Sequence, residues 1–137
     1  MSSNSQDTER AALERVTAYK LAVVGGEQAW ADAGLMKGEP LLSDVAPQLV
    51  RAVGSIAANV AEGYARRSVR DRIRFYEYAL GSVEEAGAWY LMARHSLEAE
   101  AFEERSARLT SIRRLLLVMI RNERSGKNWN SGRPRGE

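Results

Sequence analysis

The stretch from Arg51 to Glu85, RAVGSIAANVAEGYARRSVRDRIRFYEYALGSVEE, decides how the rest of the chain folds. Its two ends carry apolar residues at helical spacing, whereas its middle is rich in arginine. The pattern predicts the end of one helix, a short corner and the start of a second helix. Gly63 is expected to close the first helix, and Ser68 followed by Asp71 resembles a capping box that begins the second.

The helix that enters the corner has an apolar seam that starts before Arg51. Its members recur every three or four residues: Leu42, Val45, Leu49, Val53, Ile56 and Val60. With Asp44 as the N-cap, Pro47 would occupy the third helical position, where its missing N–H has no intrahelical partner. A start nearer Pro40, with Pro47 as a kink, is the alternative.

The helix that leaves the corner carries two adjacent apolar stripes. The first comprises Val69, Ile73, Tyr76, Leu80, Val83, Gly87 and Tyr90, and the second comprises Phe75, Ala79, Ser82, Ala86, Trp89 and Ala93. Two stripes indicate burial on two sides, and in a small bundle the second side can be a subunit contact. We therefore expect a homo-oligomer, with Phe75 and Trp89 among the candidate interface residues.

Helical periodicity predicts two further helices. One begins near Asp7, is interrupted at Gly25 and Gly26 by a kink or a close helix contact, and ends in the turn from Gly34 to Pro40. One face of it carries Ala12, Val16, Tyr19, Val23 and Trp30. The acidic segment Ser96 to Glu104 suits a turn and the first turn of the other helix, whose seam is Phe102, Leu109, Ile112, Leu116 and Met119.

Four helices joined by short turns, with no credible strand, predict an all-α fold. The expected architecture is an antiparallel up-down-up-down four-helix bundle. We expect it to span residues 7–124, between a disordered N-terminus at 1–6 and a flexible basic tail at 125–137.

The composition is that of one globular domain. The chain has 137 residues, 45% of them hydrophobic, and no cysteine, which excludes disulfides and thiolate metal sites and fits a reducing cytoplasm. The N-terminus lacks the basic and apolar regions of a secretory signal, and the longest strongly apolar run, Leu115 to Ile120, is too short to cross a membrane. We therefore expect a cytoplasmic protein with no membrane partner.

Basic residues concentrate in the second part of the chain. Residues 1–62 hold five basic and eight acidic residues, whereas residues 63–137 hold 15 basic and 10 acidic ones. The corner contains Arg66, Arg67, Arg70, Arg72 and Arg74, and a second cluster contains Arg113, Arg114, Arg121, Arg124, Lys127, Arg133 and Arg135. Guanidinium groups bind phosphates, so both clusters are candidate surfaces for RNA or DNA. The alternative is a solvated surface whose charges balance acidic neighbours and match helix dipoles.

Polar side chains form a stripe beside the seam of the helix before the corner. Its members are Arg51, Ser55, Asn59, Glu62 and Arg66, spaced three or four residues apart. One interpretation is a hydrogen-bonded stripe that fixes helix register, with Glu62 paired to Arg66 or to an arginine of the next helix. The other is a polar subunit interface or a ligand surface.

The sequence offers little for catalysis. His95 is the only histidine, cysteine is absent, and the adjacent Glu84 and Glu85 point in different directions on a helix. We therefore expect no catalytic residues, no metal site and no cofactor.

Two segments, SIAANVAEGYARRS from Ser55 to Ser68 and FYEYALGSVEE from Phe75 to Glu85, resemble a bacterial four-helix-bundle family. That family was first noticed as open reading frames in intervening sequences of large-subunit ribosomal RNA. The resemblance implies a small antiparallel bundle that assembles as a ring-like homopentamer. It also implies kinship with the accessory protein of diversity-generating retroelements, a basic pentameric bundle that binds a reverse transcriptase and nucleic acid. The family offers no catalytic residues to carry over.

Two hypotheses for function follow. The first is a non-enzymatic, oligomeric accessory protein that binds RNA or DNA through its arginine-rich surfaces, together with a reverse transcriptase in the retroelement case. The second is a protein-interaction scaffold, in which the basic surface and Trp129 meet an acidic protein.

Overall fold

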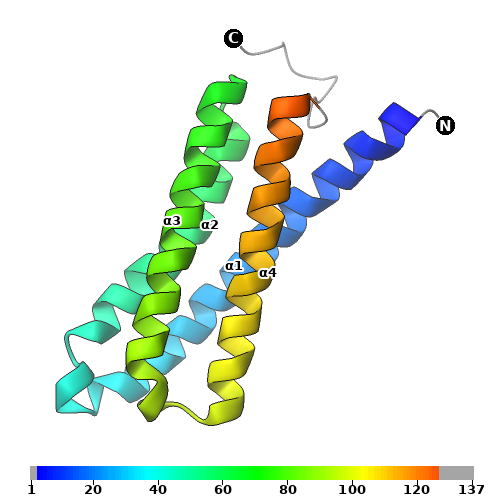
Figure 1. Ribbon diagram of the computed structural model, residues 1–137. Coiled ribbons are helices and arrows are strands. Elements are labelled where there is room, and N and C mark those ends of the chain that lie inside the picture. Colours follow the sequence, from blue (N-terminus) through cyan, green and yellow to red (C-terminus); the bar gives the residue numbers. More distant parts are fainter. Residues whose placement is uncertain (1–2, 127–137) are drawn as a thin grey trace.

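Four α-helices make up almost all of the described chain. In the computed structural model, which describes residues 3–126, they are α1 (Ser3–Lys37), α2 (Val45–Ala65), α3 (Val69–Ala93) and α4 (Ala99–Ser125). Two short 3-10 turns, η1 (Pro40–Leu42) and η2 (Arg94–Ser96), lie in the connections. Figure 1 shows successive helices running in opposite directions, with α1 and α3 each packed against α2 and α4. The prediction of an all-α four-helix fold is confirmed.

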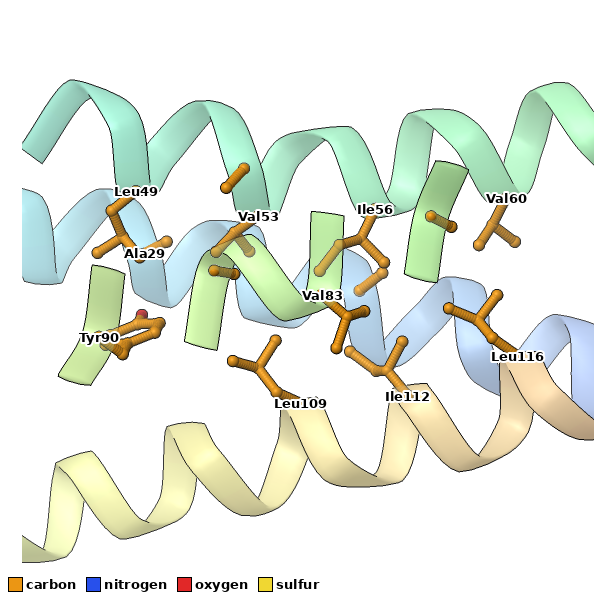
Figure 2. Packing of buried hydrophobic residues seen from close by; sticks show 14 of the residues in the cluster. Ala29, Leu49, Val53, Ile56, Val60, Val83, Tyr90, Leu109, Ile112 and Leu116 are labelled. Carbon is orange, nitrogen blue, oxygen red and sulfur yellow. The ribbon is translucent and has the colours of Figure 1, made fainter. Parts of the chain in front are cut away.

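Apolar residues from all four helices fill the centre of the bundle. Figure 2 shows their side chains meeting between the helices, with Ile56 of α2 near Val83 of α3 and Ile112 of α4, and Leu49 of α2 near Ala29 of α1 and Tyr90 of α3. The predicted seams of α2 and α4 are buried, except that their first members are only half-buried. Each fully buried Leu, Ile or Met contributes roughly 1.5–3 kcal/mol through the hydrophobic effect. No helix within the described residues has both the length and the apolar character that crossing a bilayer requires.

The start of α2 follows the first of the two predicted arrangements. Asp44 is the N-cap residue and Val45 the first helical residue, so Pro47 takes the third position, where it costs no hydrogen bond. The Asp44 side chain makes no capping hydrogen bond. The chain passes from α1 to α2 through η1, in which the Leu41 N–H donates to the Glu39 Oε1 at 3.3 Å.

Small residues, not large ones, pack α1 against the bundle. Its buried face consists of Ala11, Ala18, Ala22, Ala29, Ala33 and Met36. The stripe singled out from the sequence lies on another side of the helix, where Val16, Tyr19, Val23 and Trp30 are exposed. Alanine lets the helix axes approach closely, whereas the larger side chains stay on the exposed side.

The predicted interruption of α1 is wrong, because the helix runs unbroken through Gly25 and Gly26. An interior glycine costs only about 1 kcal/mol, so a long helix can contain two of them. The expected close contact is present at Gly25, where a Cβ would lie 3.6 Å from Val53. The helix also begins at Ser3, although disorder was expected up to residue 6; extending a formed helix by one turn costs little.

Gly63 does not close α2, contrary to the prediction. The helix continues to Ala65, and Gly63 lies buried in its last turn. Its missing side chain makes room for α3, since a Cβ there would lie 2.6 Å from the Tyr76 Cε1 and 3.2 Å from the Phe75 Cβ. The glycine is needed for close packing of the two helices, not for helix termination.

The start of α3 agrees with the sequence. Ser68 is the N-cap residue, with extended backbone, and its Oγ accepts a hydrogen bond from the Asp71 N–H at 3.0 Å. Only three residues therefore separate α2 from α3, and this short corner holds the arginines at one end of the bundle.

Candidate nucleic-acid interface

One arginine of the corner is buried and fixes the corner in place. Arg72, in the first turns of α3, donates from Nε to the Glu123 Oε1 of α4 at 2.8 Å. Its Nη1 donates to the backbone carbonyls of Arg66 and Arg67 at 3.1 and 2.7 Å. The side chain of Arg72 is 8% exposed and that of Glu123 is 1% exposed. Arg72 therefore ties the corner to α4 and is withdrawn from the phosphate-binding cluster that the sequence indicated.

The other arginines of the corner reach solvent. Arg67, Arg70 and Arg74 are exposed and Arg66 is half-buried. Arg66 pairs with Glu62 in the last turn of α2, and its guanidinium lies 5.0 Å from the centre of the Phe75 ring. Arg74 lies 5.2 Å from the same ring.

Among the described residues, Arg67 and Arg70 form no ion pair. Arg74 lies 3.6 Å from Asp71. Because this last pair is exposed, it is worth little and an incoming phosphate could replace the carboxylate.

The end of α4 lies beside this corner. Arg121 and Arg124 are exposed and flank Glu123, the partner of Arg72, so they lie at the same end of the bundle as the corner (Figure 1). We call the exposed set Arg67, Arg70, Arg74, Arg121 and Arg124 the basic end.

The rest of the predicted C-terminal cluster is spread along the chain. Arg114 is exposed on the same side of α4 as Arg121, seven residues earlier, or about 10 Å along the axis. Arg113 is exposed but donates from Nε to the Glu84 Oε1 of α3 at 2.9 Å. Lys127, Arg133 and Arg135, together with Trp129, lie outside the described residues.

The polar stripe of α2 makes its hydrogen bonds within its own helix. The Ser55 Oγ donates to the Arg51 carbonyl at 2.7 Å, and the Asn59 Nδ2 donates to the Ser55 carbonyl at 2.9 Å. Glu62 pairs with Arg66, as one interpretation expected. These bonds do not link α2 to another helix, so they do not set the register between helices. The alternative, a subunit interface, stays a prediction.

Residues of both apolar stripes of α3 pack in or against the core of a single copy of the chain. The alanines of the second stripe are buried in the core. Phe75 and Trp89 are half-buried; the Phe75 ring meets Tyr78 edge-on at 5.5 Å, and the Trp89 Nε1 donates to the Glu85 Oε2 at 3.0 Å. The second stripe therefore does not by itself require a subunit contact.

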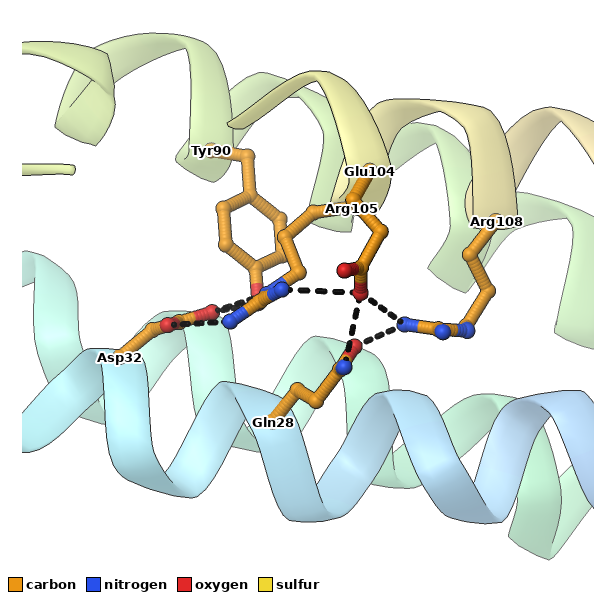
Figure 3. Close-up of polar contacts among 6 residues, drawn as sticks. All are labelled: Gln28, Asp32, Tyr90, Glu104, Arg105 and Arg108. Carbon is orange, nitrogen blue, oxygen red and sulfur yellow. Dashed lines mark hydrogen bonds and ion pairs between the residues drawn. The ribbon is translucent and has the colours of Figure 1, made fainter. Parts of the chain in front are cut away.

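A polar network not anticipated from the sequence joins α1, α3 and α4 toward the other end of the bundle (Figure 3). Asp32, buried on α1, accepts from the Tyr90 hydroxyl at 2.6 Å and from the Arg105 Nε and Nη2 at 2.9 and 3.1 Å. Glu104 accepts from Arg105 at 3.0 Å and from the Gln28 Nε2 at 2.8 Å. Arg108 completes the network by hydrogen bonding to Gln28.

The network shifts the pKa values of Tyr90, Glu104 and Arg105. Burial raises the pKa of Tyr90, and the hydrogen bond and charge of Asp32 raise it further. Hydrogen bonding to Asp32 raises the pKa of Arg105. The hydrogen bond from Gln28, followed by the charges of Arg105 and Arg108, lowers the pKa of Glu104. These groups satisfy one another, so the network acts as a structural lock between helices.

A signal for this lock was present in the sequence. Asp32 follows Ala29 by three residues and precedes Met36 by four, which puts a carboxylate on the alanine face of α1. A carboxylate on a buried face needs a cationic partner. The larger residues on the other side of α1 masked this face. In the described part of the chain, no three His, Asp or Glu side chains converge as metal ligands would.

Comparisons with known proteins cover the corner and its flanking helices. A family model described as 23S rRNA-intervening sequence protein matches residues 41–117, more than half of the chain. A solved structure of a protein of unknown function from the S23 ribosomal protein family of Bacteroides thetaiotaomicron is similar, with a TM-score of 0.73 and 20% identity. The similarity covers 79% of this chain and 98% of that one, and at this identity it shows the fold alone. No curated protein is significantly similar in sequence.

Proposed function

The chain belongs to the 23S rRNA-intervening sequence protein family, and from this premise we propose that it is a non-enzymatic accessory protein that binds RNA through its basic end. One observation carries the proposal. The exposed arginines of α3, of the corner before it and of the end of α4 surround a buried Arg72–Glu123 pair. That pair neutralises Glu123, and the five exposed arginines outnumber Asp71, the carboxylate beside Arg74, so the outward charge of this end is positive.

The geometry of the basic end suits a phosphate backbone. Packed helices have axes about 8–10 Å apart, so arginines from α3 and α4 can contact phosphates on more than one nucleotide. Guanidinium groups bind phosphate oxygens bidentately and independently of sequence. Binding of this kind releases counterions and therefore weakens steeply as salt increases.

The test is a binding titration with a structured RNA, measured by fluorescence anisotropy over a series of salt concentrations. Arg67→Gln with Arg70→Gln should weaken binding and reduce the slope of log K against log salt by about 0.7–0.9 per lost phosphate contact. A DNA duplex of the same length, titrated in parallel, separates RNA from DNA as the preferred ligand.

A matched control removes the same charge from the other end of the bundle. Lys37 at the end of α1 and Arg94 in η2 are both exposed, so Lys37→Gln with Arg94→Gln changes the net charge equally. Binding should stay near the wild-type value. Equal losses in the two double variants, or no binding at low salt, would overturn the proposal.

The family resemblance adds two partners to this proposal. The first is a second copy of the chain, in a ring-like homopentamer. The second is a reverse transcriptase, which should co-purify after nuclease treatment if the chain acts in a diversity-generating retroelement. A protein partner retained when the basic end is neutralised, with no RNA bound, would favour the scaffold hypothesis instead.

A further inference from the structure

An exposed aromatic residue continues the basic end along α3. Arg70, Arg74 and Tyr78 follow one another at four-residue spacing, so they form one row on the helix surface, with about 6 Å along the axis between successive residues. Both arginines are exposed, and Tyr78 is 52% exposed. The row therefore leads from the charges of the basic end to an open aromatic ring.

A second aromatic residue holds the Tyr78 ring in place. Phe75, one turn earlier, is half-buried, and the two rings meet edge-on with their centres 5.5 Å apart. The guanidinium groups of Arg66 and Arg74 lie 5.0 and 5.2 Å from the centre of the Phe75 ring. Phe75 also packs closely on α2, since a Cβ on Gly63 would lie 3.2 Å from the Phe75 Cβ. Because its neighbour is fixed, Tyr78 loses little side-chain freedom when a ligand binds.

Two carboxylates balance the arginines beside these rings in the free protein. Glu62 pairs with Arg66. Asp71 lies 3.6 Å from Arg74. All four side chains are more than 40% exposed, and exposed ion pairs are worth little. A phosphate, which binds guanidinium bidentately, can therefore replace either carboxylate when a nucleotide reaches Tyr78.

Other exposed aromatic residues lie in different surroundings. Tyr19 and Trp30 are on α1, across the bundle from α3. Tyr64 of α2 is turned toward α1, where the Arg15 guanidinium lies 5.0 Å from the centre of its ring. Among the exposed aromatic residues of positions 3–126, Tyr78 alone shares a helix face with arginines of the basic end.

Cationic side chains that lead to an aromatic ring are the combination by which many proteins bind single-stranded nucleic acid. The cations contact phosphates along the backbone, and the ring stacks on a base. In a duplex, neighbouring bases cover both faces of each base, so a ring on the outer surface of a helix cannot stack on them. An unpaired base in a loop, a bulge or a single strand leaves a face open.

We propose that the basic end binds RNA at an unpaired nucleotide, whose base stacks on Tyr78 and whose flanking phosphates contact Arg70 and Arg74. This inference rests on the proposed RNA binding and adds the class of RNA and the residue that distinguishes it. The base is held by its face, so the site accepts any of the four bases. Stacking releases no counterions, so the contribution of Tyr78 should be nearly independent of salt, unlike that of the arginines.

Fluorescence anisotropy with two RNAs tests the inference: a single strand of about 12 nucleotides, within the length that single-strand sites cover, and a duplex of the same length. Tyr78→Leu keeps an apolar side chain and a good helix former but removes the ring. It should weaken single-strand binding by about 5- to 150-fold, the range that base–aromatic stacking covers. Duplex binding, the slope of log K against log salt and helical circular dichroism should stay unchanged.

Two further variants separate the ring from the fold. Tyr78→Phe keeps the ring and should bind both RNAs as the wild type does. The matched control is Tyr19→Leu, which removes a tyrosine of similar exposure from α1 and should also bind both RNAs like the wild type.

Photochemical cross-linking locates the base directly. A single strand that carries one 4-thiouridine should cross-link to the peptide from Phe75 to Arg94, which trypsin releases because no other lysine or arginine lies within it. The cross-link should be lost in Tyr78→Leu and kept in Tyr19→Leu.

Equal weakening of single-strand and duplex binding by Tyr78→Leu would overturn the inference, because the ring would then act through the shape of α3. Unchanged single-strand binding would also overturn it, and a lower mass in light scattering would then assign Tyr78 to a contact between copies. If neither RNA binds at low salt, the proposed function fails and this inference fails with it. If Arg67→Gln with Arg70→Gln weakens binding of both RNAs but Tyr78→Leu does not distinguish them, only this inference fails.

Discussion

The two ends of the bundle use arginine in opposite ways. In the lock, Arg105 is 14% exposed and divides its donors between Asp32 and Glu104. At the basic end, Arg67 and Arg70 project into solvent without an ion pair among the described residues. Arg72 lies in the basic end by position but resembles Arg105 by environment, because a buried carboxylate meets it. The comparison teaches that an arginine-rich stretch counts toward binding only after its buried pairs have been set aside.

The largest effect expected from this comparison is the loss of Glu123. Glu123→Ala leaves the Arg72 guanidinium buried with only carbonyl partners, which should lower the free energy of unfolding by about 3–5 kcal/mol. Urea unfolding followed by circular dichroism measures it. Replacing the pair together, Arg72→Met with Glu123→Leu, is the control and should recover most of the loss, because no charge stays buried. If Glu123→Ala lowers the free energy of unfolding by less than about 1 kcal/mol, the Arg72–Glu123 pair contributes no more than an exposed ion pair.

A smaller loss is expected where α2 and α3 approach each other beneath the basic end. Gly63→Ala forces a Cβ to within 2.6 Å of the Tyr76 ring, and overpacking of this kind costs about 1–3 kcal/mol. Gly26→Ala is the matched control, since nothing lies within 4 Å of its Cβ position, and it should stabilise the protein by about 1 kcal/mol through helix propensity. If thermal melts show both variants equally stable, close packing at Gly63 does not hold the corner.

The lock should also make the stability of the protein depend on pH. The pKa of Tyr90 is raised in the folded protein, whereas in the unfolded chain it is about 10. At a pH between the pKa of Tyr90 in the unfolded chain and its higher pKa in the folded protein, the unfolded state binds fewer protons than the folded state. The contribution of Tyr90 to the free energy of unfolding is therefore fully present below about pH 10. It falls as the pH rises further, by up to about 1.4 kcal/mol per pH unit.

Tyr90→Phe should remove that slope, whereas Tyr78→Phe, at an exposed position, should keep it. Unfolding free energies measured on both sides of pH of about 10 supply the comparison. The same slope in wild type and Tyr90→Phe would mean that Tyr90 ionises as freely in the folded state as in the unfolded one.

The sequence was sufficient for the fold because α2 and α4 bury large residues at regular spacing, and because Ser68 marks the start of α3. It failed for α1, where the buried face is made of alanine and the larger residues point outward. Hydrophobic periodicity weighs side-chain size, so it selects the larger stripe even when close helix approach decides the packing.

The candidate site was predictable in part for a similar reason. The cluster of arginines was evident from composition, but the partner of Arg72 lies 51 residues away, and no local pattern links them. The spacing does indicate that Arg72 is buried, since it precedes the buried Tyr76 by four residues and therefore lies on the same face of the helix. The lock was missed because its members come from three helices, and only their packing brings them together.

The smallest effect on stability is expected at the arginines proposed to bind RNA. Arg67→Gln with Arg70→Gln should change the free energy of unfolding by no more than about 0.5 kcal/mol, because both side chains are solvated in the free protein. Urea unfolding of the variant and wild type in the same buffer measures this. The near-zero value matters because it separates binding from folding: a variant that unfolds like wild type but binds RNA more weakly has lost contacts, not structure. A loss near that of Glu123→Ala would instead show that these arginines, like Arg72, hold the corner, and the contrast between the two ends would then fail.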